Sequence, residues 1–201
     1  MRSKLFTLLL TCALSTTLFA RPHFYFNTAI SKPFAPESFS GDWHSGYELG
    51  VGAGFMMNKR LEIIPAFDYN NFALNDQSFL SDYLGQDNIY SSVTGGTTHL
   101  FHVGIDAKYL VPPKVSSKIT PYIIGGAGFG SRIITEKEII TAAETSHDPR
   151  HTFSGAWAGG GLGFEFIMGG NTYFVLEGRF NVLFADKATI YAPIKFGITI
   201  K

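Results

Sequence analysis

The stretch Thr172–Phe184, TYFVLEGRFNVLF, alternates two kinds of side chain along its length. Its even positions read Phe174, Leu176, Gly178, Phe180, Val182 and Phe184, whereas its odd positions read Tyr173, Val175, Glu177, Arg179 and Asn181, with Leu183 as the one exception. A period of two residues is typical of a β-strand with one apolar and one polar face. The stretch Trp157–Met168 repeats this pattern, with Glu165 among glycines on its polar face.

Eight segments of the chain read as strands, and none reads as a convincing helix. The segments are residues 23–33, 45–56, 61–73, 99–110, 119–133, 155–167, 172–184 and 189–200. Short connections with turn residues lie at 57–60, 111–118 and 168–171, whereas longer polar loops lie at 34–44, 74–98 and 134–154. Short turns at one rim and long loops at the other are typical of an outer-membrane barrel, and an even strand count predicts both termini at the periplasmic rim.

In seven of the segments, the charged side chains all lie on one of the two alternating faces of the strand, and the apolar side chains dominate the other face. This polar set consists of Glu48, Glu62, Asp68, Asp106, Lys108, Arg132, Glu165, Glu177, Arg179 and Lys195, and His102 shares its parity. We predict that these residues converge on the interior of a closed barrel, where glycines of the same parity make room for long side chains. A soluble barrel with this pattern would bury the apolar face instead, so the parity alone leaves both possibilities open.

Two further features of the strands favour a membrane. The apolar bands are about ten residues long, which is the length that a tilted transmembrane strand needs. Aromatic residues also gather near strand ends on the apolar face, as in the girdles at membrane interfaces. Pro65 counts against a fully paired barrel, because proline removes a hydrogen-bond donor from the ladder.

The first twenty residues have the features of a cleaved signal peptide. Arg2 and Lys4 form a basic region, residues 5–14 form a short apolar region, and Ala20 is a plausible cleavage residue. The only cysteine, Cys12, lies in this segment. Residues 21–201 are then one domain with two more acidic than basic residues, a balance that does not point to nucleic acid. We expect export to the outer membrane of a Gram-negative cell envelope.

Four segments carry a resemblance to a known family. TPYIIGGAGFG (120–130), SGAWAGGGLGFEF (154–166), NTYFVLEGRF (171–180) and YAPIKFGITI (191–200) resemble the small outer-membrane β-barrel family of OmpA-like and OmpX-like domains. The resemblance covers residues 119–200 and implies an all-β fold, an eight-stranded antiparallel transmembrane β-barrel with short periplasmic turns and longer extracellular loops. Such barrels commonly end in an aromatic residue, whereas this chain ends in Thr199, Ile200 and Lys201.

The inward charges suggest a function and its alternatives. An eight-stranded barrel is just wide enough for side chains to fill, so we predict a lumen plugged by a charged network. The role would then be structural or a surface interaction carried by loops 74–98 and 134–154, with outer-membrane lipid around a monomer. The alternatives are a narrow pore and a small-molecule carrier, including a soluble lipocalin-like barrel. A lipocalin would have a Gly-x-Trp sequence near its first strand, and Gly41-Asp42-Trp43 matches that sequence but lies in a loop.

Catalytic and metal sites have little support in the sequence. A lipid deacylase of barrel type would need a histidine, a serine and a glutamate on the lipid side, and His99, His102, His147, His151, Ser154 and Glu144 show no diagnostic spacing. Two histidines with Asp148 in one loop are too common to indicate a metal. We therefore expect no enzymatic activity, no metal and no cofactor.

Overall fold

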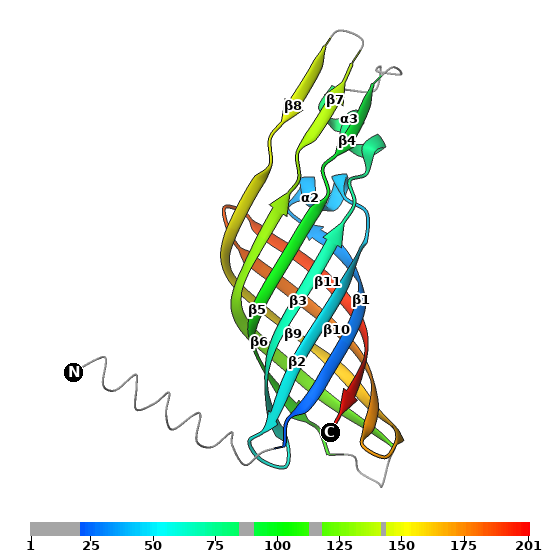
Figure 1. Ribbon diagram of the computed structural model, residues 1–201, viewed down its shortest axis with the longest axis vertical. Helices are drawn as coiled ribbons and strands as arrows, with labels where there is room; N and C mark the ends of the chain where they lie inside the picture. The colour runs from blue at the N-terminus through cyan, green and yellow to red at the C-terminus, as the bar shows by residue number, and fades with distance from the viewer. Residues whose placement is uncertain (1–20, 85–90, 113–117, 142–143) are drawn as a thin grey trace, which may run out of the picture.

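Eight antiparallel strands close into a barrel in the computed structural model, which describes residues 21–84, 91–112, 118–141 and 144–201 (Figure 1). The strands follow one another around the barrel in the order β1-β11-β10-β9-β6-β5-β3-β2. Their bounds are β1 His23–Ala35, β2 Gly46–Met56, β3 Leu61–Phe72, β5 Thr98–Leu110, β6 Ile119–Ile134, β9 His151–Gly169, β10 Thr172–Phe184 and β11 Ala188–Ile200. The predicted fold class is confirmed, and each predicted strand is present.

The two ends of the barrel differ in structure. One end, here called the turn end, carries the turn between β2 and β3, the turn between β9 and β10, and both His23 and Lys201 (Figure 1). The other, here called the loop end, carries additional elements. The predicted signal peptide at 1–20 and most of the connection at 111–118 lie outside the described residues.

The elements at the loop end correct the expectation of long irregular loops without a helix. Strands β4 Ser92–Gly95, β7 Lys137–Ile140 and β8 Thr145–Asp148 form a second sheet in the order β4-β7-β8. Helix α2 spans Glu37–Asp42 and helix α3 spans Asp76–Leu84. The side chain of Asn75 accepts a hydrogen bond from the Ser78 amide and Asp76 lies in the first turn of α3, so the helix starts with favourable polar groups. Elements this short contain too few residues for a periodic pattern of apolar side chains to be recognised in the sequence.

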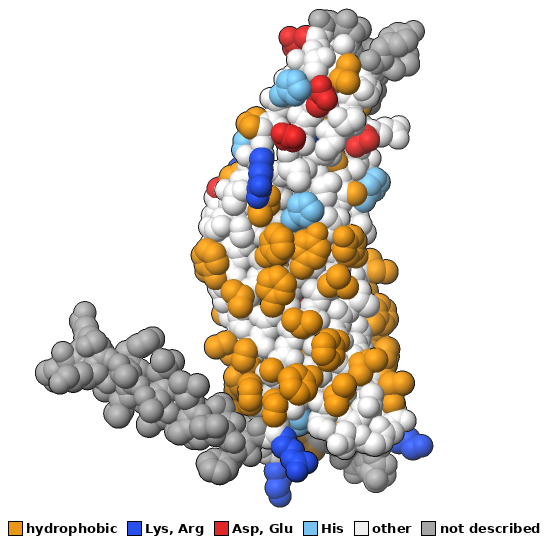
Figure 2. Space-filling model, in the orientation of Figure 1, with side chains coloured by type: hydrophobic (Ala, Val, Ile, Leu, Met, Phe, Trp, Pro, Cys, Tyr) orange, Lys and Arg blue, Asp and Glu red, His pale blue; other side chains and the backbone are white. Residues whose placement is uncertain are grey.

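The two faces of the barrel wall are inverted relative to a soluble protein. Large apolar side chains point outward and form a band around the barrel, with Leu162 64% and Ile30 63% exposed (Figure 2). The ten charged side chains of the predicted polar set point inward and are buried, whereas Lys32 of β1 is exposed. A soluble lipocalin-like barrel would bury the apolar face instead, and so this arrangement excludes that alternative. No helix in the described parts of the chain is long and apolar enough to cross a membrane.

Two prolines interrupt the hydrogen-bonded ladder without shifting its register. Between β2 and β3, pairing runs from Tyr47 to Gly52 and resumes at Phe55, and the gap lies opposite Pro65. Pairing of β10 with β11 has a similar gap at Pro193, which lies inside β11. The barrel therefore tolerates each proline by losing ladder contacts on one side only.

Candidate functional site: the lumen and the loop end

The ten charged residues predicted from the sequence all lie in the lumen, and each is at most 8% exposed. The alternation of the strands places them there, because every second residue of a barrel strand points inward. They do not form one continuous cluster. Arg132 lies apart, where its Nη1 donates to Thr189 Oγ1 at 2.7 Å and its Nη2 lies 3.4 Å from Asp186 Oδ1 near the loop end. The other nine are divided among three groups.

Arg179 joins two carboxylates in the first group. Its Nη1 lies 2.8 Å from Asp106 Oδ2, and its Nε donates to Glu177 Oε1. Glu177 also accepts a hydrogen bond of 2.8 Å from the Tyr122 hydroxyl. Because Asp106 lies on β5 and Arg179 on β10, the pair spans the lumen. Buried charges are tolerated only where such partners replace water.

Lys195 is the centre of the second group. Its Nζ lies 2.5 Å from Glu48 Oε1 and 2.8 Å from Asp68 Oδ1. The other oxygen of Asp68 lies 2.9 Å from His102 Nε2, and the His102 ring stacks on Trp157 with centroids 4.2 Å apart. Asp68 of β3 thus contacts residues of both β5 and β11, and β11 is adjacent to neither β3 nor β5 in the barrel.

The third group closes the turn end. Lys108 Nζ pairs with Glu165 Oε1 and lies 3.8 Å from Glu62 Oε2. Glu62 also accepts a 2.6 Å hydrogen bond from the Tyr25 hydroxyl. The last residue of the chain, Lys201, turns toward the lumen and places its Nζ 2.6 Å from Glu165 Oε2. The C-terminal lysine, which departs from the pattern of the resembled family, is therefore part of the network.

Lys201 improves the balance of charge in the lumen. The six acidic and four basic residues read from the sequence would leave an excess of negative charge. Lys201 supplies one further positive charge. Sequence reasoning missed Lys201 because this residue follows the last predicted strand. It also missed Tyr25, Tyr122 and Tyr191, whose hydroxyls contact Glu62, Glu177 and His102, because the parity argument was applied to charged residues; the inward parity of the tyrosines was the available signal.

Glycines facing the lumen provide the space that the long side chains occupy. A Cβ atom added to Gly50 would lie 2.0 Å from Asp68 Oδ1, and one added to Gly126 would lie 2.0 Å from Asp106 Oδ1. At Gly163 the added atom would lie 2.3 Å from Tyr122 Cζ. The inward glycines and the charged side chains are therefore complementary in volume.

Little free space remains between these groups. A space of about 40 Å³ lies among Tyr25, Asn27, Asp106, Arg179 and neighbouring side chains. A volume of this size holds on the order of two or three waters. Asn27 Oδ1 and Asp106 Oδ1 border it and have no hydrogen-bond partner within the described residues, so they are suitable sites for such waters. The lumen at this level is filled by side chains.

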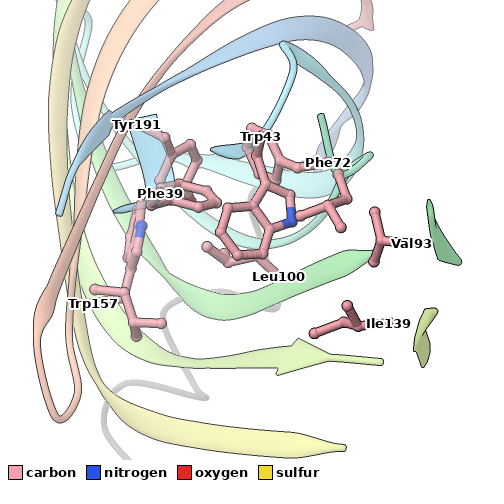
Figure 3. Packing of buried hydrophobic residues seen from close by; sticks show 10 residues of the cluster. Phe39, Trp43, Phe72, Val93, Leu100, Ile139, Trp157 and Tyr191 are labelled. Carbon is pink, nitrogen blue, oxygen red and sulfur yellow. The ribbon is translucent and has the colours of Figure 1, made fainter. Parts of the chain in front are cut away.

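An apolar layer lies on the loop side of the charged groups and contacts them where the Trp157 ring stacks on His102. Figure 3 shows how the residues of this layer pack. This layer, here called the cap, consists of Phe39, Trp43, Phe72, Leu74, Val93, Leu100, Ile139, Trp157, Leu183 and Tyr191. The Phe39 ring of α2 contacts Phe72 with centroids 5.0 Å apart, and Trp43 Nε1 donates to Gly96 O at 3.0 Å. Of the run Gly41-Asp42-Trp43, noted from the sequence only as a lipocalin sign, Trp43 is thus part of the cap. Burial raises the pKa of Asp42, beside Trp43.

The histidines considered for catalysis or metal binding lie in different places. His102 is in the lumen, while His99 faces outward and bonds Tyr69. His151 Nε2 lies 2.9 Å from Asp148 Oδ1, and Ser154 bonds Ser131. Burial alone would raise the pKa of Asp148, but its hydrogen bonds with His151 and Lys137 outweigh that effect and lower the pKa below its usual value. Across the described residues, no three metal-ligating side chains are grouped.

Comparison with known proteins defines the class of this fold. No model of a known protein family matches the sequence, and no curated protein matches it. Among solved structures, the chain is similar to Neisserial surface protein A, with a TM-score of 0.57 and 14% identity over 90% of this chain and 96% of that chain. It is also similar to Ail, the attachment invasion locus protein of Yersinia pestis, with a TM-score of 0.52 and 10% identity over 90% of this chain and 97% of that one.

A major outer membrane protein from Thermus thermophilus has a TM-score of 0.50 and 10% identity over 90% of this chain and 99% of that chain. At these identities the likeness concerns the fold. The chain has the fold of the small eight-stranded outer-membrane β-barrels, which is the architecture that the OmpA-like and OmpX-like resemblance implied.

Proposed function

We propose that this protein is a monomeric outer-membrane barrel whose residues 1–20 are removed on export and whose lumen does not conduct. Its role is structural or a surface interaction, carried by the segments 74–98 and 134–154 on the extracellular side. The proposal assigns no catalytic step and no cofactor to the chain. The outward apolar band supports the membrane location, because lipid is the solvent that such a surface requires.

The observation that carries this proposal is the contrast between the lumen and the loop end. Within the described residues, the lumen is filled by ion pairs and covered by the cap, and the space of about 40 Å³ among these side chains is too small for a solute larger than a few waters, which supports a lumen that does not conduct. The loop end instead extends beyond the barrel as a sheet and helix α3 (Figure 1). The name of Ail refers to attachment and invasion, which is compatible with a surface role for a barrel of this fold.

The test replaces residues 136–149 by a short glycine-containing turn that joins β6 to β9. Because the barrel strands are unchanged, we expect the variant to fold and to reach the outer membrane like the wild type. Intact cells carrying it should attach less to glass and to cultured cells than wild-type cells do. A matched variant with an altered turn at residues 57–60, at the opposite end, should attach normally.

Two results would contradict the proposal. Equal attachment by the wild type, the 136–149 variant and cells lacking the protein would show that the loop end carries no surface interaction. Discrete single-channel currents from the purified wild type in planar bilayers would show that the lumen conducts, and a pore function would replace this one.

A further inference from the structure

A groove lies on the outside of the barrel wall at the loop end, separate from the lumen and from the tip of the sheet. It has a volume of about 990 Å³ and runs over β2, β3, β5 and β6 beneath the connections that lead into β7 and out of β8. Its volume is within the range of about 300–1,000 Å³ that small-molecule sites occupy. Unlike the convex band below it, this surface is concave and is bordered by polar residues on one side.

The wall of the groove is apolar and faces outward. Leu49 and Val51 of β2 are 55% and 48% exposed, and Phe67 of β3 is 43% exposed. Phe101 of β5 lies beside them, with its ring centroid 5.0 Å from that of Tyr69. In a membrane this part of the groove lies against acyl chains, and an acyl chain is the ligand portion that its surface fits.

The upper side of the groove carries an oriented hydrogen-bond donor. His99 Nδ1 lies 2.8 Å from the Tyr69 hydroxyl and 3.2 Å from Asn71 Nδ2, and the His99 and Tyr69 rings are stacked. Because the amide nitrogen of Asn71 can only donate, Nδ1 accepts and the ring hydrogen lies on Nε2. The Nε2–H group is left as a donor at the border between the apolar wall and the polar loop end.

Arg150 adds a positive charge to the same border. It lies between β8 and β9, lines the groove, and has no acidic side chain within 4.0 Å among the residues that the structure describes. Glu136 lines the same border and can accept a hydrogen bond from a hydroxyl or amino group. Figure 2 shows histidine and basic side chains directly above the hydrophobic band.

A second hollow on the barrel wall shows what ordinary lipid contact requires. It has a volume of about 370 Å³, lies over β1, β10 and β11, and is lined by residues such as Phe26, Phe174 and Phe196 with no charged side chain. The groove at His99 differs in having two donors at its border, His99 Nε2 and the Arg150 guanidinium, and the guanidinium has no acidic side chain within 4.0 Å among the described residues. Guanidinium groups favour phosphate oxygens, with which they form charge-assisted hydrogen bonds.

We propose that this groove binds one phosphorylated lipid of the outer leaflet, with an acyl chain along Leu49, Val51 and Phe101 and a headgroup phosphate at Arg150 and His99 Nε2. Glu136 then contacts hydroxyl or amino groups of the headgroup. The site rests on the membrane location proposed above and not on the surface interaction. Binding of lipid to the groove can be measured on the purified protein, so the proposed lipid site can be disproved while the proposed function still holds.

The experiment measures the binding of lipid A to the purified barrel in detergent by native mass spectrometry. The ligand series is lipid A, its dephosphorylated form, and inorganic phosphate as a competitor. Arg150→Gln and His99→Phe each remove a donor and keep much of the side-chain volume. Arg60→Gln at the turn end, where Arg60 lies 3.4 Å from the Tyr109 hydroxyl, is the matched control. Unchanged heat-modifiable gel mobility shows that each variant is folded.

We expect Arg150→Gln to weaken the binding of lipid A by about tenfold, as loss of a hydrogen bond to a charged group does. Arg60→Gln should bind like the wild type. The wild type should bind dephosphorylated lipid A about tenfold more weakly than lipid A. The Arg150→Gln variant should bind the two lipids with nearly equal affinity, because the contact between Arg150 and the phosphate is already absent in it. Equal binding of both lipid forms, or an unchanged Arg150→Gln variant, would overturn the proposal. Effective competition by inorganic phosphate would also overturn it, since the site would then bind a small anion and not a lipid.

Discussion

Gly163 and Tyr122 share a space in which only one of them can have a side chain. An added Cβ at Gly163 would overlap the Tyr122 ring, which is held by the hydrogen bond from its hydroxyl to Glu177. We therefore expect Gly163→Ala to destabilise the folded barrel by about 1–3 kcal/mol, as overpacking does. Urea unfolding in lipid vesicles measures the change.

The control for this prediction is Gly178→Ala. Gly178 faces outward on the neighbouring strand, and an added Cβ would meet nothing within 4 Å. This change should leave the free energy of unfolding unchanged or slightly raised. Equal destabilisation of the two variants would mean that the alanine acts through strand propensity and that the lumen is loosely packed near Tyr122.

Arg179 provides the second prediction at this scale. Arg179→Met leaves Glu177 and Asp106 buried without their cation, so we expect a loss of about 3–5 kcal/mol in unfolding free energy. Adding Glu177→Gln and Asp106→Asn should restore a large part of that loss, because the unpaired charges are then removed. If Arg179→Met lowers the unfolding free energy no more than a substitution at the exposed Arg60 does, these carboxylates are solvated by water and not by Arg179.

Individual lumen residues could be predicted from the sequence only where they are charged, because a charged side chain in an alternating strand identifies the face that points inward. Glu48, Asp68 and Lys195 were found in this way, and the structure adds which partner each contacts. Alternation gives the face of a residue but not its height in the barrel or its neighbour across the lumen, since both depend on strand tilt and closure. Phe39, in a short loop helix, could not be placed by any period.

At the scale of elements, strand β9 offers a matched pair of outward residues. Leu162 is 64% exposed within the strand, whereas Met168 is 65% exposed near its end at the turn. We expect Leu162→Arg to weaken folding in lipid by about 2–4 kcal/mol and Met168→Arg by about 0–1, because the cost of a charge falls toward the interface. Equal effects would indicate that the membrane centre does not lie at Leu162.

Elements were predictable in proportion to their length. The barrel strands have 11–19 residues, so their alternation is repeated often enough to be recognised. Strands β4, β7 and β8 have only four residues each, and α2 has six. Val93 and Ile139 in these short strands are buried in the cap, where tertiary contacts and not local pattern determine their structure.

At the scale of the whole molecule, the cap and the charged groups are packed as one unit. Trp43 and Trp157 are the two tryptophans of the chain and both belong to the cap, so intrinsic fluorescence reports on it. Trp157 also stacks on His102, which contacts Asp68. We expect tryptophan fluorescence and heat-modifiable gel mobility to change at the same urea concentration. An earlier change in fluorescence would show that the cap opens while the barrel remains closed.

The ion pairs connect parts of the chain that are far apart in sequence. Lys195 and Asp68 are separated by 127 residues, and Lys108 and Glu165 by 57. During synthesis and export, therefore, Glu48 and Asp68 are made long before Lys195, the cation that pairs with both of them, and Lys201 is made last. A half-formed sheet in hydrocarbon would expose these charges together with open strand edges, both of which are costly there. We expect this chain to enter the bilayer only as its first and last strands meet, so that insertion and closure are a single step.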